Sequence, residues 1–138
     1  MIKIFYGERG SGKTQKMVAD ANEFAEKAIG YVVYLDRDFN RIHDLVREIR
    51  LVNCFDYGIK TDVDLLAFIK GLIAGNSDIQ RIYIDSIARL TDKCICDLNS
   101  MFNQMKELNE SFGTEFALTV EGSYDNLPSF VKQYAKEK

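Results

Sequence analysis

Residues 7–14 of the chain read GERGSGKT, a glycine-rich segment that ends in a lysine and a threonine. The apolar and aromatic run 2–6 precedes it, and apolar residues recur at helical spacing from Lys13 onward. The pattern G-x-x-x-x-G-K-T between a buried strand and a helix is typical of a loop that holds phosphate groups. The sequence therefore predicts an anion-binding turn near its amino terminus.

The residue types in this segment suit that chemistry. Glycines let the backbone curl until successive amides face a phosphate oxygen, where a Cβ would obstruct the approach. Lys13 can reach the outer phosphates of a nucleotide as a mobile charge, and the Thr14 hydroxyl is placed to ligate Mg²⁺. We expect the nucleotide to be bound by Gly7, Gly10, Ser11, Gly12, Lys13 and Thr14.

Short apolar runs alternate with helical patterns along the whole chain. Strands are expected at residues 2–6, 31–35, 51–55, 81–85 and 115–120. Helices are expected between and after them, from 13 to 30, over 42–49, from 61 or 62 to 76, from 91 or 92 to 113, and from 128 onward. Nearly unbroken apolar strands indicate a parallel sheet that is covered on both faces. The predicted fold class is α/β, with three layers around a five-stranded, mainly parallel sheet, and residues 1–138 are expected to form one domain.

The run RIYID at residues 81–85 is the second signature. An apolar strand that ends in an aspartate puts a carboxylate at the carboxyl edge of the sheet, beside the phosphate loop. There Asp85 can hold Mg²⁺ directly or through water. We therefore expect Thr14 and Asp85 to form the metal site.

Composition narrows the classes of protein to consider. The 138 residues carry 21 acidic and 18 basic side chains in interspersed order, for a formal net charge of −3. That distribution does not indicate a nucleic-acid or lipid ligand, and no apolar stretch has the length of a membrane span. Three cysteines, an odd number, and the lack of a secretory leader pattern predict a cytoplasmic location.

Cys94 and Cys96 form a C-x-C pair inside the helix expected before Gly113. Side chains at positions i and i+2 of a helix point away from each other, which predicts two independent thiols. A tetrahedral zinc site needs four ligands, and His43 is the only histidine, so zinc is not expected.

The phosphate loop and the stretch 82–93, IYIDSIARLTDK, resemble the P-loop NTPases, and within them the RecA-like ATPase cores of recombinases and clock-type ATPases. The resemblance implies ATP as the nucleotide and a strand order of 3-2-4-5-1. It also implies a water-activating acidic residue after the second strand, where YVVYLDRD supplies Asp38 or, as the second choice, Asp36. Glu121 stands just past the fifth strand, at the position of the residue that senses the γ-phosphate in that group.

The function implied by the resemblance is Mg²⁺-dependent ATP binding with weak ATPase activity. The family's water-activating residue is normally a glutamate, and an aspartate is one methylene shorter, so slow hydrolysis is expected. Two alternatives stay open. One is a small-molecule or nucleotide kinase, which would need a lid over the donor, and the other is a non-catalytic nucleotide-dependent switch or adaptor.

The nucleotide and Mg²⁺ are the ligands that the sequence indicates. A protein partner and an oligomer stay open, and Arg89 could serve as an arginine finger in an assembly, although a lone arginine is usually a surface charge.

Overall fold

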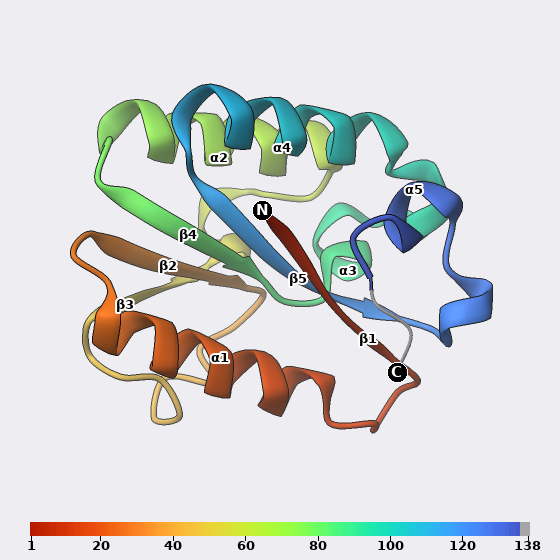
Figure 1. Ribbon diagram of the computed structural model, residues 1–138, viewed down its shortest axis with the longest axis horizontal. Helices are drawn as coiled ribbons and strands as arrows, with labels where there is room; N and C mark the ends of the chain where they lie inside the picture. Colours follow the sequence, from red (N-terminus) through yellow and green to blue (C-terminus); the bar gives the residue numbers. More distant parts are fainter. Residues whose placement is uncertain (136–138) are drawn as a thin grey trace.

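The sheet has five parallel strands in a computed structural model that describes residues 1–135. The strands are β1 (Ile2–Gly7), β2 (Tyr31–Asp36), β3 (Ile49–Asn53), β4 (Ile79–Ile84) and β5 (Glu115–Glu121). Their order across the sheet is β1-β5-β4-β2-β3, and every pair of neighbours is parallel (Figure 1). Read from the other edge, this is the predicted order 3-2-4-5-1, and the predicted α/β class is confirmed.

Helices cover both faces of the sheet. On one face lies α1 (Lys13–Lys27), and on the other lie α2 (Asp62–Gly75) and α4 (Asn99–Phe112), with the short α3 (Ile87–Thr91) and α5 (Ser129–Lys132) beside them (Figure 1). Short 3-10 turns occupy Cys54–Tyr57, Ile95–Asp97 and Tyr124–Asn126. Because parallel strands direct their carboxyl ends to one edge, the loops after them gather there.

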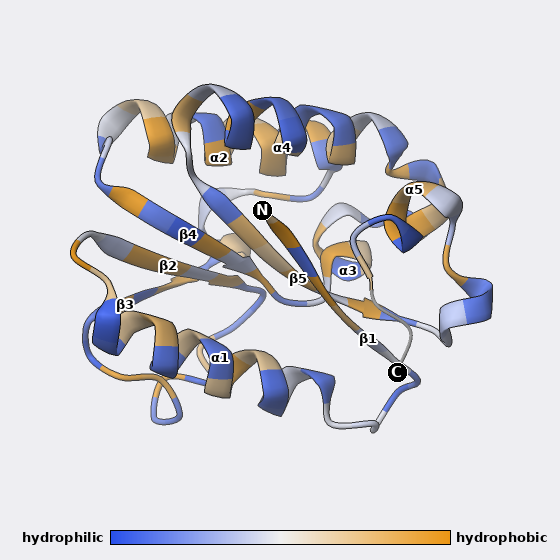
Figure 2. Cartoon of the chain, in the orientation of Figure 1, coloured by the Kyte–Doolittle hydropathy of each residue, from blue (hydrophilic) through white to orange (hydrophobic). Residues whose placement is uncertain are grey.

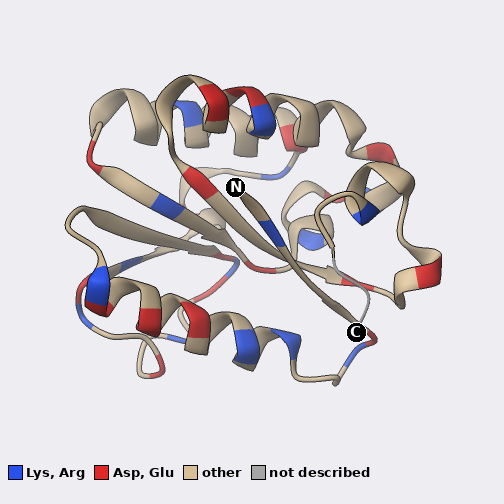
Figure 3. Ribbon diagram, in the orientation of Figure 1, with Lys and Arg blue, Asp and Glu red and all other residues tan. Residues whose placement is uncertain are grey.

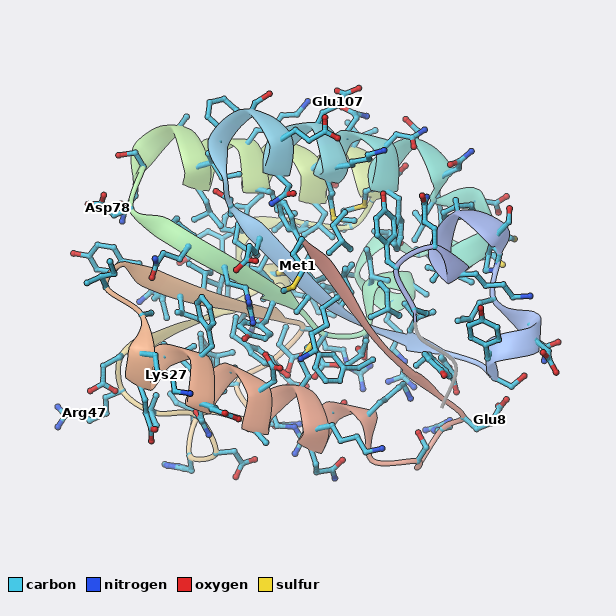
Figure 4. All side chains as sticks on the ribbon, viewed as in Figure 1. Met1, Glu8, Lys27, Arg47, Asp78 and Glu107 are labelled. Atoms are coloured by element: carbon cyan, nitrogen blue, oxygen red, sulfur yellow. The ribbon has the colours of Figure 1, made fainter. Side chains whose placement is uncertain are left out.

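The core consists of two apolar layers, one on each side of the sheet. Alternate residues of β2 show the division, since Val33 and Leu35 face the layer of α2 and α4, whereas Val32 and Tyr34 face α1. The strands are therefore apolar on both faces, and the helices turn an apolar stripe toward them (Figure 2). The outer faces of the helices are polar; Glu107 on α4 and Lys27 on α1 lie there (Figure 4).

Two helix ends follow their sequence signals closely. Thr61 is the N-cap of α2, where its hydroxyl accepts a hydrogen bond from the Asp64 amide while the Asp64 carboxylate accepts from the Thr61 amide. This reciprocal pair is a capping box. Gly113, with a φ of +76°, ends α4 in the left-handed conformation that glycine adopts most easily.

The helix expected over residues 42–49 is wrong. That segment forms consecutive turns, and β3 begins at Ile49, two residues before the expected strand. The side chain of Asn22 on α1 binds both sides of the loop: its amide donates to the Asp44 carbonyl, and its carbonyl accepts from the Val46 amide. Leu45 is buried against α1, while Ile42 is exposed. The apolar residues that suggested a helix therefore belong to a loop that packs on the core through Leu45.

The helix expected from residue 91 or 92 to Gly113 is also wrong at its start. Thr91 ends α3 instead, and its hydroxyl donates to the Ile87 carbonyl. Asp92 has a φ of +53°, which breaks the helical path, and α4 begins only at Asn99. Residues 92–98 are consequently a loop with one 3-10 turn.

Basic and acidic residues are interspersed along the ribbon, on helices, strands and loops (Figure 3). Among the described residues, no helix has the length and apolar character that a membrane span requires.

Candidate functional site

The loop between β1 and α1 has a tightly curled backbone. Gly10 and Gly12 have φ values of +82° and +88°, a region that residues with a Cβ rarely adopt. The Ser11 amide donates to the Glu8 carbonyl at 3.0 Å, which closes a turn inside the loop. Glu8 lies at the outer end of the molecule, beyond the end of β1 (Figure 4). The predicted turn is thus present, and its glycines occupy positions that call for glycine.

Gly7 is needed for a different reason. A Cβ added there would lie 2.3 Å from Ser11 Oγ and 3.0 Å from Ser11 Cβ, so a side chain at this position would force Ser11 to shift. Gly12 is the N-cap of α1 and provides no side-chain hydrogen bond. The first amides of α1 are therefore left without a cap, a combination that suits an anion.

Asp85 lies immediately after β4 and is buried, with an exposed fraction of 3%. The Thr119 hydroxyl donates to its Oδ1 at 2.7 Å, and the Tyr34 hydroxyl donates to its Oδ2 at 2.9 Å. The Thr14 hydroxyl reaches Oδ1 at 3.3 Å. Thr14 and Asp85, far apart in the sequence, therefore meet as the motifs predicted.

Sequence reasoning missed Thr119 and Tyr34. Parallel pairing puts Ile84 opposite Leu118 and Leu35, so the next residues along, Asp85 and Thr119, are neighbours across β4 and β5. Thr119 is the single hydroxyl residue in the otherwise apolar run FALTV (116–120), and that signal could have drawn attention to it. Tyr34 carried no such signal, because a tyrosine in a buried strand is ordinary.

A cavity of about 440 Å³ opens at this edge of the sheet. The phosphate loop, the residues after β2, the start of α3 and the end of β5 supply its walls. Its charged lining residues are Arg9, Lys13, Asp36, Arg37, Asp38, Arg41, Asp85, Arg89 and Glu121. Within residues 1–135, the Lys13 ammonium has no ion-pair partner and lies at the wall of the cavity.

The two acidic residues after β2 differ in their surroundings. Asp36 is buried, and its Oδ1 accepts a hydrogen bond from the Arg37 amide at 2.7 Å. Burial raises the pKa of Asp36 to about 7, and the nearby Asp85 charge adds to the increase. Asp38 is half-exposed, 3.9 Å from Arg37 Nε, and its carboxylate accepts from the Asn40 amide at 2.9 Å. Both carboxylates line the cavity, and the buried Asp36 is the one held by a backbone amide at the end of β2.

Glu121 ends β5 opposite Gly7, the last residue of β1. The Gly122 amide donates to the Gly7 carbonyl at 2.9 Å, which ties the end of β5 to the start of the phosphate loop. The Glu121 side chain is exposed and lines the cavity. The structure therefore brings all the predicted charged residues to one cavity.

The oxygen donors at this site suit Mg²⁺. No cluster of three or more His, Cys, Asp or Glu side chains within residues 1–135 could hold a metal unaided. A hydroxyl and a carboxylate 3.3 Å apart, Thr14 Oγ1 and Asp85 Oδ1, are instead a pair of hard ligands. Mg²⁺ is commonly held by such a small protein set together with phosphate oxygens and water.

Comparison with known proteins gives structural relatives only. No family model matches the chain, and no curated protein matches it by sequence. One solved structure with a similar fold is the flagellar accessory protein FlaH from Methanocaldococcus jannaschii, with a TM-score of 0.59 and 18% identity over 96% of this chain and 65% of that chain. Another is the KaiC-like protein PH0186 from Pyrococcus horikoshii OT3, with a TM-score of 0.57 and 14% identity over 96% of this chain and 66% of that chain.

The chain thus spans about two-thirds of the length of each of these structures. At such identities the likeness concerns the fold. With its all-parallel order β1-β5-β4-β2-β3, this chain has the RecA-like α/β fold.

Proposed function

We propose that the chain is a Mg²⁺-dependent ATP-binding protein with weak ATPase activity. One observation carries the proposal: the curled loop 7–14, the uncapped start of α1 and the Thr14–Asp85 pair meet at one cavity. Lys13 lines that cavity and forms no ion pair with any described residue, which suits a triphosphate. The RecA-like fold of the two relatives supports a nucleotide as the ligand.

Each residue has a separate role in this proposal. The loop amides and Lys13 bind the β- and γ-phosphates and stabilise the charge that develops during transfer. Thr14 and Asp85 would hold Mg²⁺, which when bound neutralises phosphate charge. Tyr34 and Thr119 donate to Asp85 and so orient its carboxylate. Glu121 would respond to the γ-phosphate from the end of β5.

For the attacking water, we propose Asp36 ahead of Asp38. A general base works best when its pKa lies near the working pH, and burial brings the pKa of Asp36 to about 7. The Asp38 carboxylate instead accepts hydrogen bonds from the backbone and side-chain amides of Asn40, and it lies 3.9 Å from Arg37 Nε. The P-loop NTPases that the chain resembles normally use a glutamate to activate water. An aspartate is one methylene shorter and is held less close to the water, which supports slow turnover.

Isothermal titration with ATP and Mg²⁺ tests the binding role of Lys13. Lys13→Ala should lose at least about a hundredfold in affinity, because a charge-assisted contact to phosphate is removed. Lys27→Ala is the matched control, since Lys27 lies at the opposite, exposed end of the same helix. Equal affinity of Lys13→Ala and Lys27→Ala for ATP would exclude this site.

Phosphate release from ATP tests the catalytic role. The parent chain should release phosphate slowly, Asp36→Asn should reduce the rate at least about tenfold, and Asp38→Asn should reduce it less. A larger loss for Asp38→Asn would reverse the assignment.

A small-molecule kinase is the second candidate, and one observation favours it. Arg37 and Arg41, in the loop after β2, line the cavity together with Asp36. Arginines beside an acidic group could bind an anionic acceptor and deprotonate its hydroxyl. Screening small hydroxy acids and nucleosides with labelled ATP separates the two candidates, because transfer faster than hydrolysis would favour the kinase.

A further inference from the structure

Cys94 and Cys96 are in direct contact, contrary to the expectation of two independent thiols. Their sulfur atoms lie 2.6 Å apart, and the Cys96 amide also donates to Cys94 Sγ at 3.4 Å. The pair meets because residues 92–98 form a loop instead of an α-helix. Cys94 has an extended backbone, with φ −61° and ψ 142°, and the 3-10 turn Ile95–Asp97 follows.

Both thiols are exposed and chemically accessible, whereas the third cysteine, Cys54, is buried. Burial also raises the pKa of Cys54 to about 12. A thiolate is the reactive form of cysteine, so Cys54 is protected from oxidants and alkylating reagents. Among the described residues, Cys94 and Cys96 are therefore the thiols that such reagents can reach.

The pair lies at the rim of the nucleotide cavity. Ile95, between the two cysteines, lines that cavity and packs against the core. The residue before the pair, Lys93, forms an ion pair with Asp62 at the start of α2, with Nζ and Oδ1 3.1 Å apart. The loop is held before the pair by this ion pair and after it by Leu98, which is fully buried at the start of α4. A covalent change at the two sulfurs therefore has to be absorbed by the short segment that includes Ile95.

We propose that Cys94 and Cys96 form a reversible disulfide by exchange with a low-molecular-weight disulfide, and that closing this ring weakens ligand binding in the adjoining cavity. The second part rests on the proposed function. Exposed disulfides in short rings are the labile ones, which suits a reversible modification.

The exchange proceeds in two balanced steps. Cys94 Sγ receives both donors from Cys96 and is the attacking sulfur; it forms a mixed disulfide with the reagent and releases one small thiol. Cys96 Sγ then attacks Cys94 Sγ and releases the second small thiol. One reagent disulfide is reduced to two thiols, the protons of Cys94 and Cys96 end on them, and the protein gains one S–S bond.

The intact chain treated with oxidised glutathione, then alkylated with a maleimide and digested with trypsin, tests the disulfide. Trypsin cleaves after Lys93 and Lys106, so the peptide 94–106 contains both cysteines of the pair, and Cys54 falls in the separate peptide 51–60. The expected peptide 94–106 has lost two hydrogens and carries neither maleimide nor glutathione. Cys96→Ser should stop at a glutathione adduct on Cys94, because the second thiol is missing.

Three other results would overturn the disulfide: a stable glutathione adduct in the parent peptide, maleimide on both cysteines after oxidation, or a link between two copies of the chain. Cys54→Ser should behave like the parent.

Titration of ATP and Mg²⁺ into the reduced and the oxidised chain tests the coupling. Affinity should fall at least about fivefold on oxidation and recover with a dithiol reductant, and the double variant Cys94→Ser, Cys96→Ser should not respond. Unchanged or tighter binding by the oxidised chain would overturn the coupling. If the reduced chain binds no ATP, the proposed function is wrong. The disulfide is tested separately, because the peptide masses do not depend on ATP binding.

Discussion

Asp85 shows how one buried carboxylate can be kept ready for a ligand. A buried charge is costly unless it is hydrogen-bonded. Three neighbouring elements supply the donors, since Tyr34 comes from β2, Thr119 from β5 and Thr14 from α1. The same hydroxyls fix the direction of the carboxylate, so its stability and its ligand geometry have one origin.

Asp85→Ala should destabilise the chain even without ligand. The substitution leaves the buried hydroxyls of Tyr34 and Thr119 without their acceptor, which should lower the free energy of unfolding by about 2–4 kcal/mol. Asp85→Asn keeps one carbonyl acceptor and should cost less. Urea denaturation measures both; an Asp85→Ala chain as stable as the parent would show that the hydroxyls find other partners.

Asp36 should make stability depend on pH. The pKa of an unperturbed aspartate is 3.8, and that of Asp36 is about 7 in the folded chain, so between these values the folded state binds the proton more tightly. The contribution of Asp36 to the free energy of unfolding is therefore fully present below about pH 4, and it is lost as the pH rises through 7.

Asp36→Asn removes that ionisation. The variant should melt at the parent's temperature near pH 4 and at a higher temperature than the parent at pH 8, as followed by circular dichroism. Asp38→Asn is the comparison variant, because it makes the same chemical change at a half-exposed position of the same loop. A parent and an Asp36→Asn chain with parallel melting curves across this range would contradict the burial argument.

At the scale of elements, the loop between β1 and α1 depends on backbone conformation more than on side-chain contacts. Gly12 begins α1 with a φ of +88° and has open space around it, since a Cβ there would meet no heavy atom nearer than 3.8 Å. Strain alone therefore opposes a side chain at this position.

Gly12→Ala should cost about 1–2 kcal/mol of stability through the left-handed backbone. Gly71→Ala is the matched control: Gly71 lies in α2 with nothing within 4 Å of an added Cβ, and alanine should stabilise that helix by about 0.5–1 kcal/mol. Thermal unfolding of the two variants should thus shift in opposite directions. The same sign for both would mean that the loop relaxes around the added methyl group.

Elements with strong local signals were predictable from the sequence. The capping residues at Thr61 and Gly113 and the glycines of the phosphate loop act within one turn of the chain, so a single sequence contains their information. The segment 42–49 was not predictable in this way. Its turns depend on the Asn22 side chain of α1, a contact between segments that periodicity does not record.

At the scale of the whole molecule, the candidate site exists only when the sheet is assembled in register. The motifs predicted that Thr14 and Asp85 would meet, because a parallel sheet gathers its loops at one edge. They could not predict Tyr34 and Thr119 as partners of Asp85, because that requires the strand order and the register together.

Ligand binding should therefore stabilise the entire chain, since the unfolded state has no site. At ATP and Mg²⁺ concentrations about a hundred times Kd, the gain is about 2.7 kcal/mol, which corresponds to a rise in Tm of about 10 °C for a chain of this size. Differential scanning fluorimetry with and without EDTA measures it. Lys13→Ala should show no rise, and an equal rise in EDTA would argue against a metal.

The pairing of β1 with β5 has a consequence for biosynthesis. β1 leaves the ribosome first of the five strands, yet within residues 1–135 it pairs with β5 alone, and β5 is the last of the five to be made. Until β5 has been made, the glycine loop follows a strand whose partner in the described sheet is missing. A nascent chain stalled before Glu115 should not be retained on immobilised ATP, and retention should begin only after β5 has emerged from the exit tunnel.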